Sequence, residues 1–368
     1  DGIVAAETAA SRILECFEKP FILGEREIFV TASMGITVSP TEGVDPHVLL
    51  RNADAAMYKA KDQGRDAFQF FTPEMNEHAM KRLRVESNLR QALEKEEISL
   101  AFQPVVDPRS QAIEGVEVLA RWHNDELGPV PPDQFIPVAE DVGLIVPIGA
   151  WVLRNACEQA VTWSRLVHRP LFVTVNVSSR QFRGSDFVEI ATGALDESGL
   201  PPELLVMEIT ERLLMQDAAE SLETMSRLSE MGVRFSIDDF GTGYSALSYL
   251  RTFPFDFLKI DKSFMSRFDE DEEERALVST IIGMGQSLGL RITAEGVETG
   301  SQVEYLLDHD CGLIQGFYYS RPVNAAGIVK LLEQGNERIK PTLVDPAERA
   351  VEVVDFRPKH RRRRINHA

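Results

Sequence analysis

From about Leu89 onward, short apolar runs rich in β-branched residues alternate with longer amphipathic segments. Eight such runs are present: Ile98–Val106, Ile113–Trp122, Leu171–Val177, Leu204–Ile209, Val233–Asp238, Phe255–Ile260, Arg291–Ala294 and Gly312–Gln315. The segments between them include Ile148–Trp163, Ala218–Met231 and Glu273–Leu288. Strands that alternate with helices indicate a parallel α/β sheet. Eight of them over about 250 residues predict a TIM-like (β/α)8 barrel.

The first two strand-like runs break this alternation. Only Asp107–Gln111 separates them, and this link contains Pro108. A link so short cannot hold a crossover helix, and it favours an antiparallel pair. We therefore expect a barrel whose first strand is antiparallel.

Residues 1–75 differ in character and predict part of an α+β domain. We expect a helix over Ile3–Glu18, a strand over Arg26–Val38, a helix over Pro46–Gln63 and a strand over Phe68–Phe71. These strands are too few to form a stable sheet alone. The predicted organisation is a partial domain at 1–75, a complete barrel at 80–335 and a tail at 336–368.

Charge and cysteine usage restrict the class of function. The net charge of −19 argues against wholesale nucleic-acid binding. It permits a small anionic ligand, because divalent cations can reverse the local field. The tail contains a basic run, Arg357–Arg364, which we expect to be disordered; the alternative is contact with an anionic surface.

The cellular setting is also predicted. Cys16, Cys157 and Cys311 lie far apart and outside any C-x-x-C motif, which favours neither thiolate metal binding nor a disulfide framework. No apolar stretch approaches the ~18 residues of a membrane span, and no signal peptide is visible. We expect a cytoplasmic protein, or the cytoplasmic portion of a larger, membrane-attached one.

Polar side chains recur where the predicted strands end. They are Glu117, Asn176, Glu208, Asp238, Asp239, Lys259, Glu295 and Gln315. The carboxyl ends of barrel strands meet on one face, where TIM-barrel active sites lie. The sequence therefore predicts that these residues share one pocket.

So many carboxylates in one pocket would repel one another unless protons or cations neutralised them. Carboxylate and amide oxygens are the ligands preferred by hard ions such as Mg²⁺ or Mn²⁺. The adjacent Asp238 and Asp239 favour a two-metal site that activates water for displacement at phosphorus. A nearby lysine can orient that water, and a spare carboxylate can take its proton.

Each residue taken singly has a simpler explanation. An acidic residue after a strand is commonly a helix N-cap. Glu208 and Glu211 would also suit the first turn of a helix, and Asp238–Tyr244 could be a glycine-bearing turn. The repetition at successive strand ends favours the site.

Several of these residues lie within motifs of a known family. They read Gln103-Pro-Val-Val, Glu117-Val-Leu-Ala-Arg-Trp, Phe135-Ile-Pro-Val-Ala-Glu, Asn176-Val-Ser, Glu208-Ile-Thr-Glu, Asp238-Asp-Phe-Gly-Thr-Gly-Tyr-Ser, Lys259-Ile-Asp, Ala294-Glu-Gly-Val-Glu and Gln315-Gly-Phe. Through them the segment Leu83–Leu332 resembles EAL-domain phosphodiesterases. The resemblance implies a barrel with an antiparallel first strand. It also implies hydrolysis of cyclic di-GMP to linear pGpG with Mg²⁺ or Mn²⁺, inhibition by Ca²⁺, and a homodimer.

The resemblance also implies residue roles. Metal ligands would be Glu117, Asn176, Glu208 and Asp238, with Asp239 in a second metal site. Lys259 would contact the attacking water, Glu295 would be a general base or second-site ligand, and Glu211 would hold the Asp239–Ser245 loop. Substrate contacts would come from Arg121, Gln103, Leu119, Glu298 and Gln315.

The motif that names the family has one departure, because Val118 replaces its usual alanine. The side chains of Val118 and Glu117 point to opposite faces of a strand, so we expect the metal site to survive. The alternative is some loss of catalytic rate from altered packing.

Residues 1–75 resemble the C-terminal half of a GGDEF domain. The match lies in Thr31-Ala-Ser-Met-Gly-Ile and Ala53-Asp-Ala-Ala-Met-Tyr-Lys-Ala-Lys. The loop that carries cyclase chemistry is absent, so Lys61 and Arg65 lack their partners and this chain is not expected to make cyclic di-GMP.

Two other functions stay open for the barrel. One is a catalytically silent cyclic di-GMP receptor that signals through a dimer interface. The other is a TIM-barrel metallohydrolase for a different phosphodiester.

Overall fold

The computed structural model describes residues 2–17, 19–24, 26–39, 45–62, 66–216, 218–241, 250–266, 268, 271–334 and 339–341. The chain divides into two compact units, Asp1–Asn88 and Leu89–Ala368. The boundary expected near residue 80 falls within helix α3 (Pro73–Leu89).

The first unit contains a small parallel β-α-β arrangement. Strand β3 (Ser33–Ile36) pairs with β4 (Ala67–Phe70) in parallel, and helix α2 (Pro46–Asp62) connects them. The glycine at position 35 permits close packing, because a Cβ there would lie 1.8 Å from the carbonyl oxygen of Ala53 in α2. Helix α1 (Gly2–Glu15) precedes this arrangement.

The prediction of one strand over Arg26–Val38 was wrong. Residues in this range form two strands in separate sheets: β2 (Arg26–Ile28) pairs with β1 (Phe21–Leu23) in a hairpin, whereas β3 pairs with β4. Apolar alternation continues across both strands, so the pattern could not reveal that their pairing partners differ. Phe29, between them, is 71% exposed.

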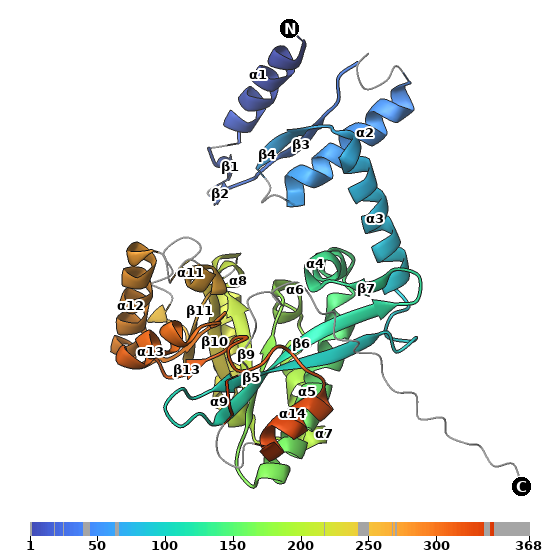
Figure 1. The fold of residues 1–368 in the computed structure, drawn as a ribbon. Coiled ribbons are helices and arrows are strands. Elements are labelled where there is room, and N and C mark those ends of the chain that lie inside the picture. Colours follow the sequence, from blue (N-terminus) through green and yellow to red (C-terminus); the bar gives the residue numbers. More distant parts are fainter. Residues whose placement is uncertain are drawn as a thin grey trace, which may run out of the picture. The chain divides into compact units, whose positions relative to one another are not determined.

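Among the described residues of the second unit, eight strands close into a barrel (Figure 1). In chain order they are β5 (Ile98–Val106), β6 (Ile113–Asn124), β8 (Phe172–Asn176), β9 (Leu205–Thr210), β10 (Arg234–Phe240), β11 (Phe257–Ile260), β12 (Arg291–Ala294) and β13 (Leu313–Ile314). A further strand, β7 (Gly128–Val130), extends β6 outside the barrel. The eight predicted runs and the barrel fold are confirmed.

The first barrel strand is antiparallel to both of its neighbours, as predicted from the short link. Strand β5 runs antiparallel to β6 and to β13, and its pairing with β6 closes the barrel. The remaining neighbours pair in parallel. The register places Gln103 directly opposite Glu117, so two predicted site residues start as cross-strand partners.

Helices cover the outside of the barrel (Figure 1). They are α4 (Pro132–Val142), α5 (Ile145–Val167), α6 (Ser179–Phe182), α7 (Phe187–Ser198), the 3-10 turn η1 (Pro202–Leu204), α8 (Glu211–Gln216), α9 (Ala218–Glu230), α11 (Lys262–Ser266), α12 (Glu272–Ser287), α13 (Gly300–Asp308) and α14 (Ala325–Gln334). None of the described helices is by itself both long and apolar enough to cross a bilayer. Helices α4 and α5 meet that criterion only as a pair bent by 120°.

The barrel interior is apolar at one end and polar at the other. Val105, Phe172, Val206, Phe257 and Leu313 form a buried cluster. Val105, Val206, Phe257 and Leu313 each lie two residues from a predicted site residue, and Phe172 lies four residues before Asn176. Side chains an even number of residues apart on a strand share a face. The apolar cluster therefore forms the floor beneath the polar side chains.

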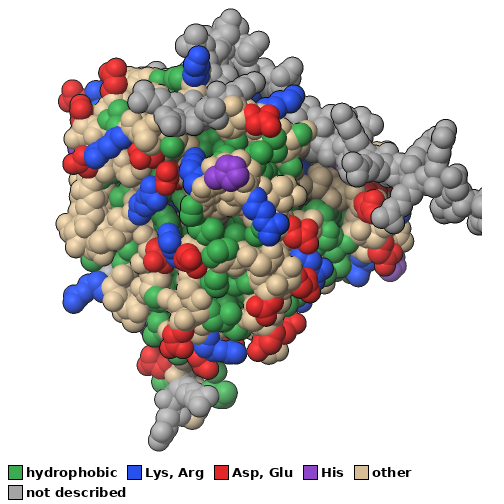
Figure 2. Space-filling view, turned by 90° about the horizontal axis from the view of Figure 1, so that it is seen from below, with side chains coloured by type: hydrophobic (Ala, Val, Ile, Leu, Met, Phe, Trp, Pro, Cys, Tyr) green, Lys and Arg blue, Asp and Glu red, His purple; other side chains and the backbone are tan. Residues whose placement is uncertain are grey.

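The surface shown in Figure 2 carries acidic and basic side chains interspersed with apolar ones. The coloured, described side chains of that face form no continuous basic patch.

Candidate active site

A buried lysine lies at the centre of the site. The Nζ atom of Lys259 is 2.7 Å from Oε2 of Glu208, 3.5 Å from Oε1 of Glu117 and 3.7 Å from Oδ1 of Asp238. It also forms an ion pair with Glu295. These residues come from β11, β9, β6, β10 and the end of β12, so the barrel gathers them as predicted.

Amide side chains extend this cluster on one side. Asn176 Nδ2 donates a hydrogen bond to Glu117 Oε1 at 2.9 Å, which leaves its own carbonyl oxygen available to a cation. Gln315 Nε2 donates to Glu117 and, at 3.0 Å, to Gln103 Oε1. Gln103 Nε2 donates in turn to the backbone oxygen of Ser320 at 3.1 Å. The network orients the Glu117 carboxylate before any ligand arrives.

Charge is unevenly balanced in this pocket. Four carboxylates face one ammonium group, so full ionisation would leave an excess of three negative charges. Burial acts to lower the pKa of Lys259. The four carboxylates favour its charged form and outweigh burial, so its pKa is raised well above its usual range. The lysine is therefore a permanent cation.

The carboxylates respond differently to the same environment. Burial and neighbouring carboxylates raise the pKa of Glu208 well above its usual range, and they raise that of Glu295 to about 7. Burial also disfavours the charged form of Glu117. The charge of Lys259 and hydrogen bonds from Gln315 and Asn176 outweigh this effect and hold its pKa below the usual range. The pocket thus contains one firmly ionised carboxylate and at least one that can hold a proton near neutral pH.

The donor set fits a hard divalent cation. Glu117, Asn176, Glu208 and Asp238 offer only oxygen atoms as ligands, which Mg²⁺ and Mn²⁺ prefer. The carboxylates point toward Lys259 in this structure. In the described part of the chain, no group of three His, Cys, Asp or Glu side chains surrounds one ion position. A cation of charge two would offset most of the excess negative charge.

Asp239 lies at the edge of the cluster. It follows Asp238 in a left-handed conformation with φ of 56°, and its backbone N–H donates to Asp238 Oδ1 at 2.9 Å. Partial burial and the neighbouring Asp238 and Asp261 raise its pKa. Its side chain is exposed, whereas that of Lys259 is buried.

Leu119, Arg121 and Glu298 are the three remaining residues predicted to contact the substrate. Leu119 and Arg121 follow Glu117 on the same face of β6, and both are half-buried. Burial lowers the pKa of Arg121, against the charge of Glu117, which raises it. Glu298 is exposed, and its backbone N–H donates to Gln302 Oε1 at 2.7 Å.

Glu211 opens helix α8 and is 7% exposed. Its Oε1 atom has no hydrogen-bond partner in the described structure, and burial raises its pKa. Of the Asp239–Ser245 loop that it was predicted to hold, residues 242–245 lie outside the described residues. So do Arg65 and most of the basic tail.

Sequence reasoning missed two hydroxyl groups in the barrel. Thr174 and Ser236 are 6% and 1% exposed, and neither hydroxyl has a hydrogen-bond partner in the described structure. Thr174 is the cross-strand partner of Glu117, and Ser236 is that of Glu208. The sequence did hold a signal for them: each lies two residues before a predicted site residue, Asn176 or Asp238, and side chains two apart on a strand share a face.

Val118 lies where the strand geometry predicted. It is 2% exposed and is the cross-strand partner of Phe102 and Val175, on the face of β6 opposite to Glu117. Its extra bulk is accommodated in packing outside the barrel lumen.

Comparison with protein families gives two matches. Residues 86–322 match the EAL domain, and residues 2–67 match the diguanylate cyclase, GGDEF domain. The second match ends within the first compact unit.

Curated relatives match most of this chain. It is 43% identical over 320 residues to the bifunctional diguanylate cyclase/cyclic di-GMP phosphodiesterase MucR of Pseudomonas aeruginosa, which covers 87% of this chain and 47% of MucR. It is 37% identical to the cyclic di-GMP phosphodiesterase PdeR of Escherichia coli, over 87% of this chain and 48% of PdeR. The chain thus spans about half the length of these relatives.

Solved structures match the barrel. A complex of the P. aeruginosa MucR phosphodiesterase with c-di-GMP aligns with a TM-score of 0.64 and 43% identity, covering 67% of this chain and 99% of that one. The EAL enzyme Bd1971, bound to cAMP and cyclic di-GMP, aligns with a TM-score of 0.66 and 32% identity, covering 69% of this chain and 70% of that one.

Proposed function

This chain belongs to the EAL domain family, and from that premise we propose that it hydrolyses cyclic di-GMP to linear pGpG with the help of divalent cations. The observation that carries the proposal is the convergence of Glu117, Glu208, Asp238 and Glu295 on the buried Lys259. A neutral or apolar ligand would gain nothing from so many fixed charges. A phosphodiester that binds through metal ions requires carboxylates to hold those ions.

The metal would be held by Glu117, Asn176, Glu208 and Asp238, with Asp239 in a second site. When bound, Mg²⁺ or Mn²⁺ supplies Lewis-acid activation of water and stabilises charge on the phosphate. Ca²⁺ is expected to inhibit, because it has a longer ligand distance and a looser geometry.

The chain's own residues supply the rest of the chemistry. Lys259 carries a fixed positive charge that orients the attacking water. Glu295, with a pKa of about 7, takes the proton of that water at neutral pH. Gln315 and Gln103 hold Glu117 in place, and Arg121 contacts a substrate phosphate with its guanidinium group.

Leu119 and Glu298 would complete the substrate pocket, and Glu211 would position the loop after Asp239. The homodimer expected from the family and a cytoplasmic location both stay predictions.

The test is to incubate the purified chain with cyclic di-GMP and Mg²⁺ or Mn²⁺ and to measure pGpG by chromatography. Glu117→Ala should abolish product formation. Glu114→Ala is the matched control, because Glu114 lies on the same strand and outside the cluster, where it faces Arg291 at 3.7 Å. The control should retain activity within about twofold.

The other outcomes separate the alternatives. Binding of cyclic di-GMP without turnover, with every metal tried, would refute the enzyme and support a receptor. Neither binding nor turnover would point to a different phosphodiester. Equal loss in Glu117→Ala and Glu114→Ala would show that the assay reports folding rather than the site.

A further inference from the structure

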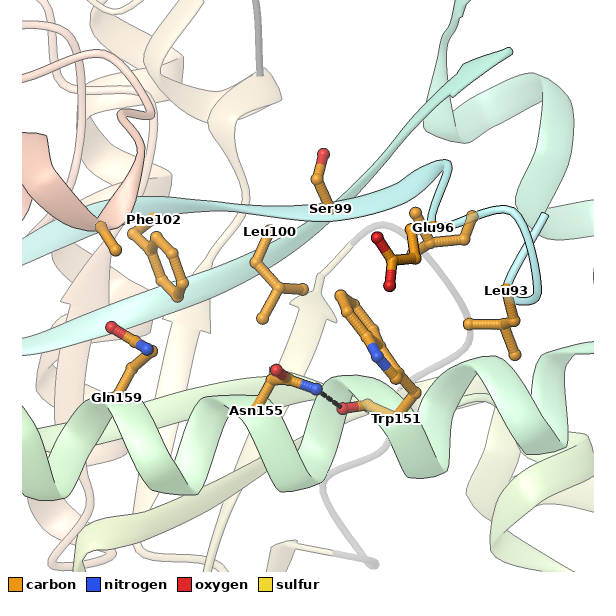
Figure 3. Close-up of a pocket in the computed structure, with 10 residues that line it drawn as sticks. Leu93, Glu96, Ser99, Leu100, Phe102, Trp151, Asn155 and Gln159 are labelled. Carbon is orange, nitrogen blue, oxygen red and sulfur yellow. Dashed lines mark hydrogen bonds between the residues drawn. The ribbon is translucent and has the colours of Figure 1, made fainter. Parts of the chain in front are cut away.

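A cavity of about 350 Å³ lies on the outer side of the barrel wall, between β5, the turn before it and helix α5. Figure 3 shows Leu100 and Phe102 reaching down from β5 toward Trp151, Asn155 and Gln159 on α5. Its volume lies within the range of small-molecule sites, about 300–1,000 Å³.

This cavity is separate from the carboxylate cluster. Phe102 lines the cavity, whereas the next residue, Gln103, bonds to Gln315 inside the barrel. Successive side chains of a strand point to opposite faces. Strand β5 is therefore the wall between the two sites.

Among the described residues that line the cavity, the one charged side chain is acidic. Asn155 Nδ2 donates to the backbone oxygen of Trp151 at 2.8 Å, so its carbonyl oxygen is the atom left for a ligand (Figure 3). Glu96 contributes a carboxylate from the turn before β5. Of the described residues that line the cavity, none is a lysine, arginine or histidine.

Aromatic and apolar surface completes the cavity. Trp151 is half-buried and stands beside Glu96 in Figure 3, and Leu93, Leu100 and Phe102 supply the remaining wall. A cation near an indole face and a carboxylate gains from both. A phosphate group would meet the negative charge of Glu96 there and no cationic side chain among the described lining residues.

We propose that this cavity binds a small organic cation, with an ammonium or guanidinium group on Glu96 and Asn155 and a flat apolar body against Trp151. This ligand class is distinct from the anionic dinucleotide proposed for the barrel interior. The proposal does not depend on catalytic activity.

Trp151 supplies the readout. The chain has three tryptophans, and Trp122 and Trp163 are 2% and 0% exposed, so Trp151 is the one open to a ligand. Tryptophan emission would be titrated with phenethylamine, a cation, 2-phenylethanol, which is neutral, and 3-phenylpropionate, an anion of similar size. We expect phenethylamine to bind about tenfold more tightly than the alcohol, and the anion to bind more weakly still.

Variants locate the binding. Glu96→Gln should weaken phenethylamine binding about fivefold and leave 2-phenylethanol unchanged. Glu158→Gln is the matched control on α5, outside the cavity lining. Gln159→Phe should fill the cavity and reduce binding of all three compounds without adding a tryptophan to the emission. Saturating Mg²⁺ should not displace phenethylamine, since the carboxylate cluster lies on the other side of β5.

The proposal would be overturned by equal affinity for the three compounds, or by no emission change at tens of millimolar phenethylamine. Equal effects of Glu96→Gln and Glu158→Gln would overturn it as well. Displacement of phenethylamine by Mg²⁺ would place the cation in the barrel interior instead.

Discussion

The ammonium nitrogen of Lys259 lies 2.7 Å from the carboxylate of Glu208, although 51 residues separate them in the chain. Their side chains are 3% and 1% exposed. A buried charge is stable only when it is paired, so each of these residues depends on the other. Because Glu117, Asp238 and Glu295 share the same lysine, Lys259 is the common counter-ion of all four carboxylates in the absence of metal.

Replacing this lysine separates binding from chemistry. Lys259→Met should lower the turnover of cyclic di-GMP to below about 1% of the wild-type rate, because the positive charge beside the attacking water is lost. Binding of cyclic di-GMP with Ca²⁺ should change less than about threefold by calorimetry. Equal loss of binding and hydrolysis would contradict the role assigned to Lys259.

The same variant has a stability signature. In the presence of a chelator, Lys259→Met leaves the buried carboxylates without a counter-charge, so the free energy of unfolding should fall by about 3 kcal/mol. Mg²⁺ should recover most of this loss. Lys330→Met, an exposed lysine on α14, is the control and should be unchanged. A loss that Mg²⁺ does not reverse would indicate a packing defect.

The pKa of Glu295 predicts how stability depends on pH without metal. It is about 7 in the folded chain, above the usual 4.5. Between these values the folded state holds a proton that the unfolded state has released. This proton on Glu295 stabilises the folded state. Its contribution to the free energy of unfolding is complete below pH 4.5 and is lost as the pH rises through about 7, by at most about 1.4 kcal/mol per pH unit.

Thermal unfolding in a chelator from pH 5 to pH 8 measures this effect, and Glu295→Gln should make the curve flatter. Because a proton competes with the cation, Mg²⁺ should raise the unfolding temperature more at pH 8 than at pH 6. A wild-type curve that rises across this interval and keeps the same slope in Glu295→Gln would refute the assignment.

Val118→Ala restores the residue that the family motif more often carries. Val118 is 2% exposed, so the smaller side chain should leave a cavity and lower the free energy of unfolding by about 2 kcal/mol. Hydrolysis should stay within about twofold, because Glu117 points to the other face of β6. Urea unfolding and initial rates test the two statements. A large change in rate without loss of stability would mean that Val118 tunes the site.

Gly316→Ala tests the close approach that positions Gln315. A Cβ at residue 316 would lie 2.0 Å from the backbone oxygen of Val297, so the chain must shift. We expect a loss of about 3 kcal/mol or more in the free energy of unfolding, together with reduced hydrolysis.

The matched control is Gly193→Ala in α7, where a Cβ would meet nothing within 4 Å. It should stabilise the chain by about 0.5–1 kcal/mol, because alanine is the better helix former. Similar destabilisation by both variants would contradict the open space around residue 193 of helix α7.

Much of the barrel was predictable because its signals are local. The apolar periodicity of each strand and the short Asp107–Gln111 link act within a few residues, and the structure agrees with both. The strand predicted over Arg26–Val38 failed because the pairing partners of β2 and β3 lie elsewhere in the chain. The residue pattern of a single strand does not determine which other strand it pairs with.

The sequence by itself determined the identity of the polar residues at the strand ends and, through the barrel rule, that they share one face. Only the tertiary structure decided how they share charge: Lys259 at the centre, Glu117 held ionised by Gln315 and Asn176, and Glu295 able to hold a proton near neutral pH. Electrostatic interaction depends on distances of a few ångströms and on burial. Both arise from residues far apart in the chain and are set only when the barrel closes.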